Sequence, residues 1–195
     1  MVWVADGQGL VLTNRHVVAS GSTATITFAD GRQVEGKVLG TDKTGADLAM
    51  LVIPAEDGTP FVPLASKYPV QGEIVCQVGW GGMRTMQKRT GVILGYREAD
   101  RYHMMLSFQV IPGDSGSGIF LPKEKKLVGV VWGWTNWGQA GAMEPLAVTL
   151  VNANRFVEAC KPLLPRNRLP RPRPGGPPVI VVPPGSEKPV TPIIP

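Results

Sequence analysis

The sequence predicts an all-β protein. Short runs rich in Val, Ile and Thr are separated by turn residues roughly every eight to twelve positions, and the 195 residues include 24 glycines and 19 prolines. β-Branched residues favour strands, and regularly spaced turn signals are typical of antiparallel sandwiches and barrels. The hydrophobic content of 43% is enough for a substantial core. We therefore expect one domain of ordinary size or two small ones, built from hairpins.

Five strands are expected in the first part of the chain. Residues 2–5 and 10–13 form one hairpin around Asp6-Gly7, and residues 24–28 and 33–39 form another around Asp30-Gly31, because Asp-Gly pairs favour tight turns. The fifth is a core strand within residues 45–53, an apolar run that opens with the acid Asp47. Residues 54–69 are proline-rich, and we interpret them as the boundary between two halves.

Six further strands and one helix are expected after this boundary. The strand candidates are residues 73–78, 87–96, 103–110, 118–121, 127–134 and 141–150. A short closing helix is expected over residues 152–160, with Asn152 as its N-cap and with Phe156, Val157 and Cys160 on one face.

The composition changes after Lys161. Twelve of the 19 prolines lie in residues 162–195, so we expect this tail to be extended and unfolded and to serve mainly as a spacer. The tail has five basic residues and one acidic residue, which accounts for +4 of the net charge of +5 and leaves +1 for residues 1–161. The basic tail is suited to contact with anionic surfaces, whereas the nearly neutral remainder gives no reason to expect specific nucleic-acid binding.

Several other classes of site are excluded. Cys76 and Cys160 form no Cys-x-x-Cys motif, which excludes a thiolate zinc site and a dithiol redox motif, and we expect buried thiols rather than a disulfide. The chain has only two histidines and no phosphate-binding Gly-Lys-Ser/Thr motif, so neither a metal nor a nucleotide cofactor is expected. No run reaches the ~18 apolar residues of a membrane-spanning helix.

Residues 111–118, Ile-Pro-Gly-Asp-Ser-Gly-Ser-Gly, are suited to a tight loop whose backbone approaches a ligand. Ser115 is a candidate nucleophile, and the amides of Gly113 and Ser115 are candidate donors to an oxyanion. The alternative is an ordinary Gly/Ser turn, because a serine hydroxyl is inert without a neighbouring base. The rest of the chain therefore has to supply that base.

Two side chains are suited to complete such a site. His16 follows a predicted strand, whereas we interpret His103 as an ordinary polar position on a strand surface. Asp47 precedes an apolar strand, and a carboxylate at the edge of a core requires a partner. A serine nucleophile needs an imidazole to take its proton and a carboxylate to orient that imidazole.

Three motifs together resemble the His, Asp and Ser boxes of the chymotrypsin-like serine proteases. They are Thr-Asn-Arg-His-Val-Val at 13–18, Gly-Ala-Asp-Leu-Ala at 45–49 and Pro-Gly-Asp-Ser-Gly at 112–116, with 31 and 68 residues separating the three key side chains. The compact bacterial branch that includes the high-temperature-requirement proteases is the most similar, over about residues 2–160. The order His, Asp, Ser separates the chain from α/β-hydrolases.

This resemblance implies two antiparallel six-stranded β-barrels with the catalytic residues in the cleft between them. Residues 1–66 would form the first barrel, residues 67–161 the second barrel and a short C-terminal helix, and residues 162–195 a disordered Pro-rich tail. Only five strand candidates precede Pro54, so the first barrel lacks its first strand. If an upstream segment supplies that strand and a secretion signal, we expect a secreted or periplasmic protein, and otherwise a cytoplasmic one.

The resemblance also implies a serine endopeptidase that acts on protein or peptide substrates. Ser115 would be the nucleophile, His16 the general base and then the general acid, and Asp47 the residue that orients His16, while the Gly113 and Ser115 amides would hold the oxyanion. The acid before the serine, Asp114, needs a partner other than a newly cut N-terminus, because Met1-Val2-Trp3 does not resemble one. The alternative function is a truncated or inactive protease fold that serves as a binding module.

The substrate-binding residues implied by the family are uncharged. They are Gln109, Val131, Trp132, Gly133 and Trp134, with residues 141–143 as a further wall. A pocket without a carboxylate does not favour Lys or Arg, so we expect a preference for small or medium apolar side chains. Core packing is the alternative role for the tryptophans.

Overall fold

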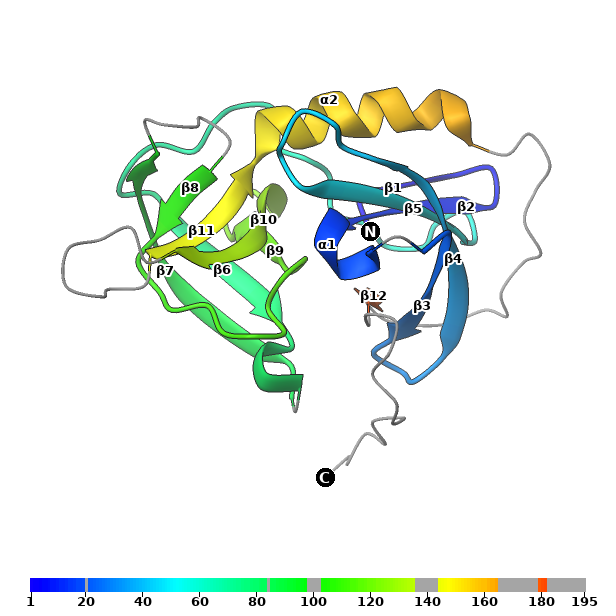
Figure 1. The fold of residues 1–195 in the computed structure, drawn as a ribbon, viewed down its shortest axis with the longest axis horizontal. Coiled ribbons are helices and arrows are strands. Elements are labelled where there is room, and N and C mark those ends of the chain that lie inside the picture. The colour runs from blue at the N-terminus through cyan, green and yellow to red at the C-terminus, as the bar shows by residue number, and fades with distance from the viewer. Residues whose placement is uncertain (20, 84, 98–102, 136–143, 165–178, 182–195) are drawn as a thin grey trace.

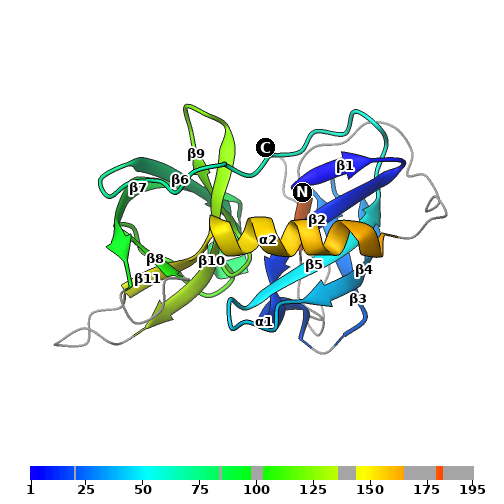
Figure 2. The same ribbon diagram turned by 90° about the horizontal axis from the view of Figure 1, so that it is seen from above.

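The computed structural model of the chain describes residues 1–19, 21–83, 85–97, 103–135, 144–164 and 179–181. Two β-rich halves lie side by side, and one long helix lies across both of them (Figures 1 and 2). No helix within the described ranges is long and apolar enough to cross a membrane.

The first half contains the five predicted strands. They are β1 (Trp3–Ala5), β2 (Gln8–Asn14), β3 (Thr23–Phe28), β4 (Gln33–Thr41) and β5 (Leu48–Pro54), with the short helix α1 (Arg15–Val18) between β2 and β3. Asp6 and Gly7 both adopt positive φ and link Ala5 directly to Gln8, as a two-residue hairpin turn requires. All neighbouring strands are antiparallel, and their order is β1-β2-β5-β4-β3.

A sixth strand of this sheet comes from the tail. β12 (Val179–Val181) pairs antiparallel with β3, opposite Ile26 to Phe28. The prediction of an unfolded tail is therefore wrong for these three residues, because a β-branched run gains backbone hydrogen bonds at an edge that is otherwise open. The other tail residues from 165 onward lie outside the described part of the chain.

β5 is buried on both faces, as predicted for a core strand. Ala49, Leu51 and Ile53 contribute to the core of the first sheet, together with residues of β2 and β3. Leu48 and Met50 point to a second cluster that both halves share. Asp47, directly before this strand, is therefore attached to one of the most buried elements of the molecule.

The second half is a closed barrel of six antiparallel strands in the order β10-β11-β8-β7-β6-β9. The strands are β6 (Ile74–Gly79), β7 (Gln87–Tyr96), β8 (His103–Leu106), β9 (Gly118–Leu121), β10 (Lys126–Thr135) and β11 (Glu144–Thr149), and a short 3-10 turn, η1 (Gly81–Met83), follows β6. β8 is shorter than the predicted strand 103–110. Its pairing ends at Ser107, whose hydroxyl accepts a hydrogen bond from the Val92 amide at 2.8 Å.

The connection between the halves is tied to the second barrel. The amide of Ala65 donates to the carbonyl of Leu127 on β10 at 2.9 Å, and the amide of Leu127 donates to the carbonyl of Pro63 at 2.9 Å. The domain boundary between residues 66 and 67 stays a prediction, and residues 63–65 already pair with the second half.

The closing helix α2 (Leu150–Cys160) confirms the predicted helix and begins two residues earlier. Thr149, the last residue of β11, is its N-cap, so Asn152 is not the cap. The strand runs directly into the helix and leaves no separate capping residue. A short 3-10 turn, η3 (Lys161–Leu163), follows it, so the prediction that the tail is unfolded from residue 162 is wrong for Pro162 and Leu163.

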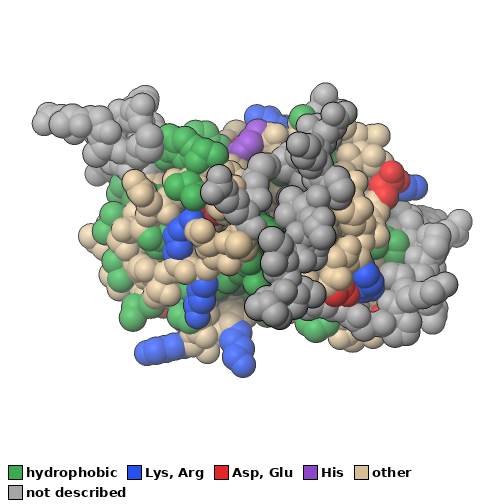
Figure 3. All heavy atoms as spheres, turned by 90° about the horizontal axis from the view of Figure 1, so that it is seen from below, with side chains coloured by type: hydrophobic (Ala, Val, Ile, Leu, Met, Phe, Trp, Pro, Cys, Tyr) green, Lys and Arg blue, Asp and Glu red, His purple; other side chains and the backbone are tan. Residues whose placement is uncertain are grey.

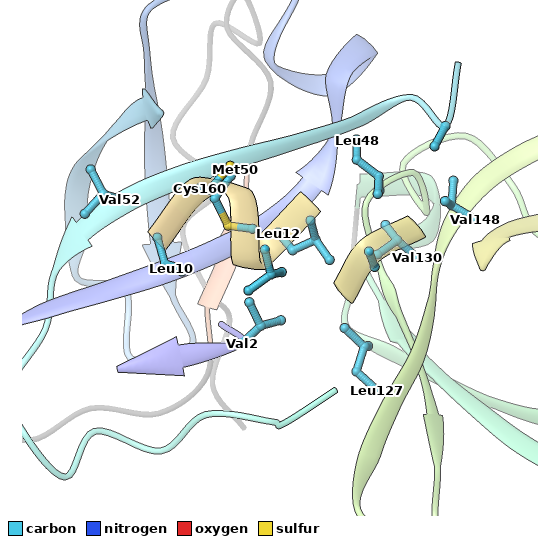
Figure 4. Close-up of a cluster of buried hydrophobic side chains, with 13 residues drawn as sticks. Val2, Leu10, Leu12, Leu48, Met50, Val52, Leu127, Val130, Val148 and Cys160 are labelled. Atoms are coloured by element: carbon cyan, nitrogen blue, oxygen red, sulfur yellow. The ribbon is translucent and has the colours of Figure 1, made fainter. Parts of the chain in front are cut away.

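One hydrophobic cluster joins the two halves under α2. It contains side chains of the first half, among them Leu10 and Met50, and side chains of the second half, among them Leu127 and Val130, and Cys160 of α2 lies next to Met50 (Figure 4). Cys160 and Cys76 are both unpaired and buried, which confirms the expectation of buried thiols. The cluster fixes the relative position of the halves that carry the predicted catalytic residues.

Candidate active site

His16 and Asp47 are held together at the end of the first sheet. His16 lies in α1, directly after β2, and its Nδ1 is 2.5 Å from Oδ2 of Asp47. The backbone amide of His16 donates to the other carboxylate oxygen, Oδ1, at 3.1 Å. The carboxylate therefore fixes both the ring and the backbone of His16, as the orienting acid of a serine nucleophile site must do.

The backbone around Asp47 is also fixed. Asp47 adopts φ +54°, a left-handed conformation that is uncommon for residues other than glycine. Its carbonyl oxygen accepts the Arg15 amide at 2.8 Å and the Asn14 side-chain amide at 3.3 Å. These bonds join the start of β5 to the end of β2, so that His16 and Asp47 meet although 31 residues separate them.

Asp42 orders the turn that leads into Asp47. Its carboxylate accepts hydrogen bonds from the Thr44 amide at 3.0 Å, the Thr44 hydroxyl at 2.8 Å and the Ala46 amide at 2.7 Å. An aspartate that binds nearby backbone amides is a common way to fix a turn. The carboxylate of Asp42 thus keeps the loop before Asp47 in one conformation.

Ser115 lies on a tight loop before β9. Gly113 and Gly116 adopt φ +95° and +84°, which explains the glycines of the motif. The Gly116 amide donates to the Val131 carbonyl at 3.0 Å, and the Val131 amide donates to the Ser117 carbonyl at 2.8 Å. The loop is therefore attached to β10 at Gly116 and Ser117.

Gly116 also brings this loop against the first half of the molecule. A Cβ atom at Gly116 would lie 2.4 Å from Oγ1 of Thr13, the residue three positions before His16. Such a distance leaves no space for any side chain at Gly116. The predicted nucleophile and the predicted base are thus on segments in direct contact.

Arg89 of β7 is the partner that the sequence required for Asp114. Its Nη1 lies 2.7 Å from Oδ2 of Asp114, whose side chain is only 1% exposed. The same carboxylate oxygen accepts the Ile111 amide at 2.9 Å, and Arg89 also donates to the buried Gln77 at 2.8 Å. An ion pair inside the second barrel therefore fixes the residue that precedes Ser115.

The amides predicted to bind an oxyanion are available. Among the described residues, the hydrogen bonds of this loop engage the amides of Ile111, Asp114, Gly116 and Ser117 and leave the amides of Gly113 and Ser115 without an acceptor. The Pro112 carbonyl accepts the Gly82 amide at 2.7 Å, which fixes the peptide plane whose other end is the Gly113 N–H. Two unengaged amides beside a serine hydroxyl are the donors that a developing oxyanion needs.

The Ser115 hydroxyl donates to the carbonyl of Trp132 at 3.3 Å. Within the described part of the chain, no hydrogen bond joins this hydroxyl to His16. A rotation about χ1 moves a serine Oγ by a few ångströms between staggered positions, and bonds between nucleophile and base are often absent before substrate binds.

The predicted substrate-binding residues occupy different environments. Gln109 is exposed and Trp132 is partly buried next to the serine, at a β-bulge between Val131 and Gly133. Val131 is fully buried in the core of the barrel, so its side chain does not face the site. Trp134 is partly buried against the same core, in agreement with the packing alternative. Residues 141–143 lie outside the described ranges.

The interpretation of His103 as a polar residue on a strand surface is wrong. His103 is buried, with an exposure of 6%, and its ring lies 5.0 Å from the ring of Trp132. The barrel covers it because β8 and β10 both pair with β11.

In Figure 3 a histidine side chain is visible at the surface near the boundary between the halves, and hydrophobic side chains gather beside it over the second half.

Two arginines were not found as site residues by sequence reasoning. Arg89 belongs to the Asp114 ion pair, and Arg15 places its Nε 3.7 Å from Oδ1 of Asp47. Arg15 directly precedes His16 in the sequence, which indicates that it lies near the site, whereas nothing in the sequence around Arg89 indicates a contact with Asp114. In the described residues, no group of three or more His, Cys, Asp or Glu side chains is arranged to hold a metal ion.

Comparisons with known proteins agree with this geometry. The family model for the trypsin-like peptidase domain matches residues 2–130. The serine endoprotease DegS of Escherichia coli (strain K12) is 34% identical over 77 residues, which are 39% of this chain and 21% of DegS. The HtrA-like serine protease of Staphylococcus aureus (strain bovine RF122 / ET3-1) is 33% identical over 149 residues, covering 67% of this chain and 19% of that protein. The chain therefore spans about one fifth of the length of these relatives.

Solved structures confirm the predicted fold. The serine endoprotease from Yersinia pestis has a TM-score of 0.67 at 22% identity, and the match covers 80% of this chain and 55% of that one. The HtrA-type protease AlgW, solved with a decapeptide, has a TM-score of 0.65 at 20% identity and covers 80% of this chain and 50% of its own.

Proposed function

Because this chain belongs to the trypsin-like peptidase family, we propose that it is a serine endopeptidase that uses Ser115, His16 and Asp47. One observation carries the proposal: the His16 ring is bound to the Asp47 carboxylate at 2.5 Å, next to a loop that presents a serine and two amides that no acceptor among the described residues engages. A histidine, a carboxylate and a serine in this arrangement are the parts that acyl transfer to serine needs.

The reaction begins when the Ser115 hydroxyl leaves the Trp132 carbonyl and donates to Nε2 of His16. Oγ attacks the carbonyl carbon of the scissile peptide bond while His16 takes the hydroxyl proton. The negative charge that forms on the carbonyl oxygen is bound by the amides of Gly113 and Ser115. The C–N bond then breaks, His16 gives the proton to the leaving amine, and an ester to Ser115 remains.

Water completes the cycle. His16 takes a proton from a water molecule, whose oxygen attacks the ester carbon, and then returns the proton to Oγ as the acid is released. Asp47 keeps Nδ1 of His16 protonated throughout, so that Nε2 is the nitrogen that accepts and donates. The carboxylate also stabilises the imidazolium, as the short contact to Nδ1 supports.

The substrate is a protein or peptide with a small or medium apolar side chain before the cleaved bond. Gln109, Trp132 and Gly133, which are uncharged, lie on the segments beside Ser115 and form the proposed recognition surface. A peptide library with all residue types before the cleaved bond tests this preference, and strong cleavage after Lys or Arg would contradict it.

A fluorophosphonate probe tests the nucleophile. We expect covalent labelling of the wild-type chain, loss of labelling in Ser115→Ala, and an unchanged fold of that variant because Ser115 contributes a single weak hydrogen bond. Ser117→Ala is the matched control, since it removes a hydroxyl two residues further along and should retain labelling.

The competing function is a protease fold that binds peptides without turnover. The bond from Ser115 to Trp132 rather than to His16 favours it. A well-folded wild-type chain that binds peptides and remains unlabelled by the probe would support this function and overturn the proposed one.

A further inference from the structure

The outer edge of β3 receives a strand from a distant part of the chain. Of the five strands that residues 1–54 contribute, β3 lies at the edge of the sheet, so one side of it presents backbone N–H and C=O groups that β4 does not use. In the structure Val179, Ile180 and Val181 lie opposite Phe28, Thr27 and Ile26 along this side. Figure 1 shows β12 beside β3, far in sequence from every other strand of the sheet.

The sequence of the tail is suited to supply one short strand. Residues 179–182, Val-Ile-Val-Val, are the only run of four apolar residues other than proline after Lys161. β-Branched residues favour the strand conformation. Pro178 and Pro183 flank the run, and proline has no N–H with which to continue a ladder of backbone hydrogen bonds.

The receiving edge lies over the core of the first sheet. Ile26 and Phe28, which lie opposite the ends of β12, are buried in the cluster that also contains Leu51 and Ile53. Thr25 and Thr27 alternate with them and are more exposed. The Phe28 amide donates toward β4, to the Arg32 carbonyl at 2.8 Å, so the backbone groups that face the open edge alternate with it and belong to Thr25 and Thr27. A strand at this edge shields those groups from water.

The segment between α2 and the run is long enough to deliver it. Fourteen residues, 165–178, separate Leu164 from Val179, and six of them are proline. A proline-rich chain spans about 3.1 Å per residue, so this segment reaches about 43 Å, more than the ~30 Å diameter of a small domain. The spacer role expected of the tail is therefore to connect α2 to the strand that pairs with β3.

We propose that the edge of β3 is a binding site for an extended β-branched peptide, and that its ligand is the Val179–Val181 segment of the same chain. The tail supplies this segment across the proline-rich spacer as a removable sixth strand. The site binds a separate peptide of the same sequence when the chain's own segment is weakened. Recognition is by backbone hydrogen bonds over three to four residues, a mode known from strand addition to sheet edges.

A pair of cysteines tests the register. In Thr27→Cys/Ile180→Cys the two new residues are directly opposite, within the Cα separation of about 4.4–6.8 Å that a disulfide allows. We expect mild oxidation to cross-link most of the protein within one chain. Thr23→Cys/Ile180→Cys is the control, because Thr23 lies four residues along β3, about 13 Å away. The native Cys76 and Cys160 are buried and do not compete.

Two results of this experiment would overturn the proposal. One is cross-linking no greater than in the Thr23 control. The other is cross-linking only between chains, which would mean that the strand comes from a second copy.

Hydrogen exchange in the full chain tests the removable character of the strand. Ile180→Pro removes the central N–H of β12, and we expect the amide of Thr27, which faces β12, to exchange about tenfold faster or more, whereas the Phe28 amide, which donates toward β4, is the internal reference. Val190→Pro makes the same kind of change further along the tail and should leave the rate unchanged. A peptide covering residues 177–183 should restore protection to the Ile180→Pro chain at millimolar concentration.

Equal exchange in the two proline variants, or failure of the peptide to restore protection, would refute the site. Neither experiment measures proteolysis, so the result does not depend on the proposed catalytic function.

Discussion

The two halves of the molecule complete their sheets in different ways. The second half closes into a barrel with six strands from one continuous region, residues 74–149. The first half has five strands of its own and takes the sixth from beyond residue 178. The half that carries Ser115 is therefore complete in itself, whereas the half that carries His16 and Asp47 depends on a distant segment.

The two halves also hold their catalytic residues differently. Ser115 lies on a loop fixed from inside its barrel by the buried pair of Arg89 and Asp114. His16 and Asp47 lie at the surface end of their sheet, where the side chain of His16 is 46% exposed. The Arg89–Asp114 ion pair thus fixes the position of the nucleophile loop, whereas hydrogen bonds at the junction of β2 and β5 fix the position of His16. Each contrast can be tested by paired substitutions.

The largest effect is expected at Asp47. Asp47→Asn tolerates the left-handed backbone but stabilises the wrong tautomer of His16, so kcat should fall by roughly 10⁴-fold. Peptide-hydrolysis kinetics measure the loss. Asp42→Asn, the same change five residues earlier, weakens only a turn and should cost about 1–2 kcal/mol of stability with far less effect on kcat. Equal losses of kcat would contradict the assigned role of Asp47.

The next largest effect is expected for the buried ion pair. Arg89→Gln leaves the Asp114 carboxylate buried without its cation, which should lower the free energy of unfolding by about 3–5 kcal/mol. Urea denaturation measures this change. Arg15→Gln removes an arginine whose side chain is 50% exposed, and should cost about 0–1 kcal/mol.

A double variant sharpens this comparison. Arg89→Gln/Asp114→Asn removes both charges and should recover part of the stability lost in Arg89→Gln. If the double variant is less stable than Arg89→Gln by a further 3 kcal/mol or so, the stability does not come from the ion pair.

A smaller loss is expected where the two halves touch at Gly116. Gly116→Ala places a methyl group against the Thr13 hydroxyl, and a displacement of about 1 Å in the Ser115 loop should lower kcat/KM about 100-fold. Gly58→Ala is matched in backbone, at φ +91°, but has nothing within 4 Å of the new methyl group. It should cost about 1 kcal/mol of stability and leave kcat/KM unchanged. Similar kinetics for both variants would exclude a role for the contact.

The smallest effect concerns alkaline pH and the second half alone, since all three tyrosines follow residue 66. Burial, followed by the charges of Tyr68 and Glu73, raises the pKa of Tyr96 to about 12. The unfolded chain loses this proton near pH 10 whereas the folded chain keeps it, so stability should be full below pH 10 and fall between pH 10 and 12. We expect a loss of about 1–2 kcal/mol after allowance for partial exposure.

Thermal unfolding at several pH values measures this loss. Tyr96 donates to the Pro69 carbonyl at 2.5 Å, and Tyr96→Phe should flatten the curve above pH 10. Tyr68→Phe keeps the more exposed ring of the pair and removes only its hydroxyl, a smaller cause of the raised Tyr96 pKa than burial, so it should keep most of the wild-type slope. A slope that survives in Tyr96→Phe would assign the effect to other groups.

The local signals in the sequence predicted most of the fold. Asp6-Gly7 and the alternating residues of β3 and β4 specify their hairpins, and the strands of the second half follow the same rules. The assembly of Ser115, His16 and Asp47 was predicted because a nucleophile, a base and an orienting acid restrict one another by their chemistry. Of these, the contact between His16 and Asp47 is present in the structure.

Pairings that depend on tertiary structure were not predictable. Arg89 and Asp114 meet because two strands of a closed barrel bring them together, and the sequence near Arg89 carries no sign of it. The ring of Trp132 on β10, two strands away in the barrel, covers His103, and alternation along β8 does not reveal this contact. The Val-Ile-Val run was obscured by the prolines around it, although its β-branched composition is itself a strand signal.

The position of β12 in the chain also sets an order of folding during synthesis. Every strand of the second barrel has been made once residue 149 is added, whereas the partner of β3 follows about thirty residues later. At translation rates of roughly 5–20 residues per second, the nascent chain spends about 2–6 s with one half completed and the other open. The first half, whose own five strands precede the second barrel in the chain, is thus the later of the two to be completed.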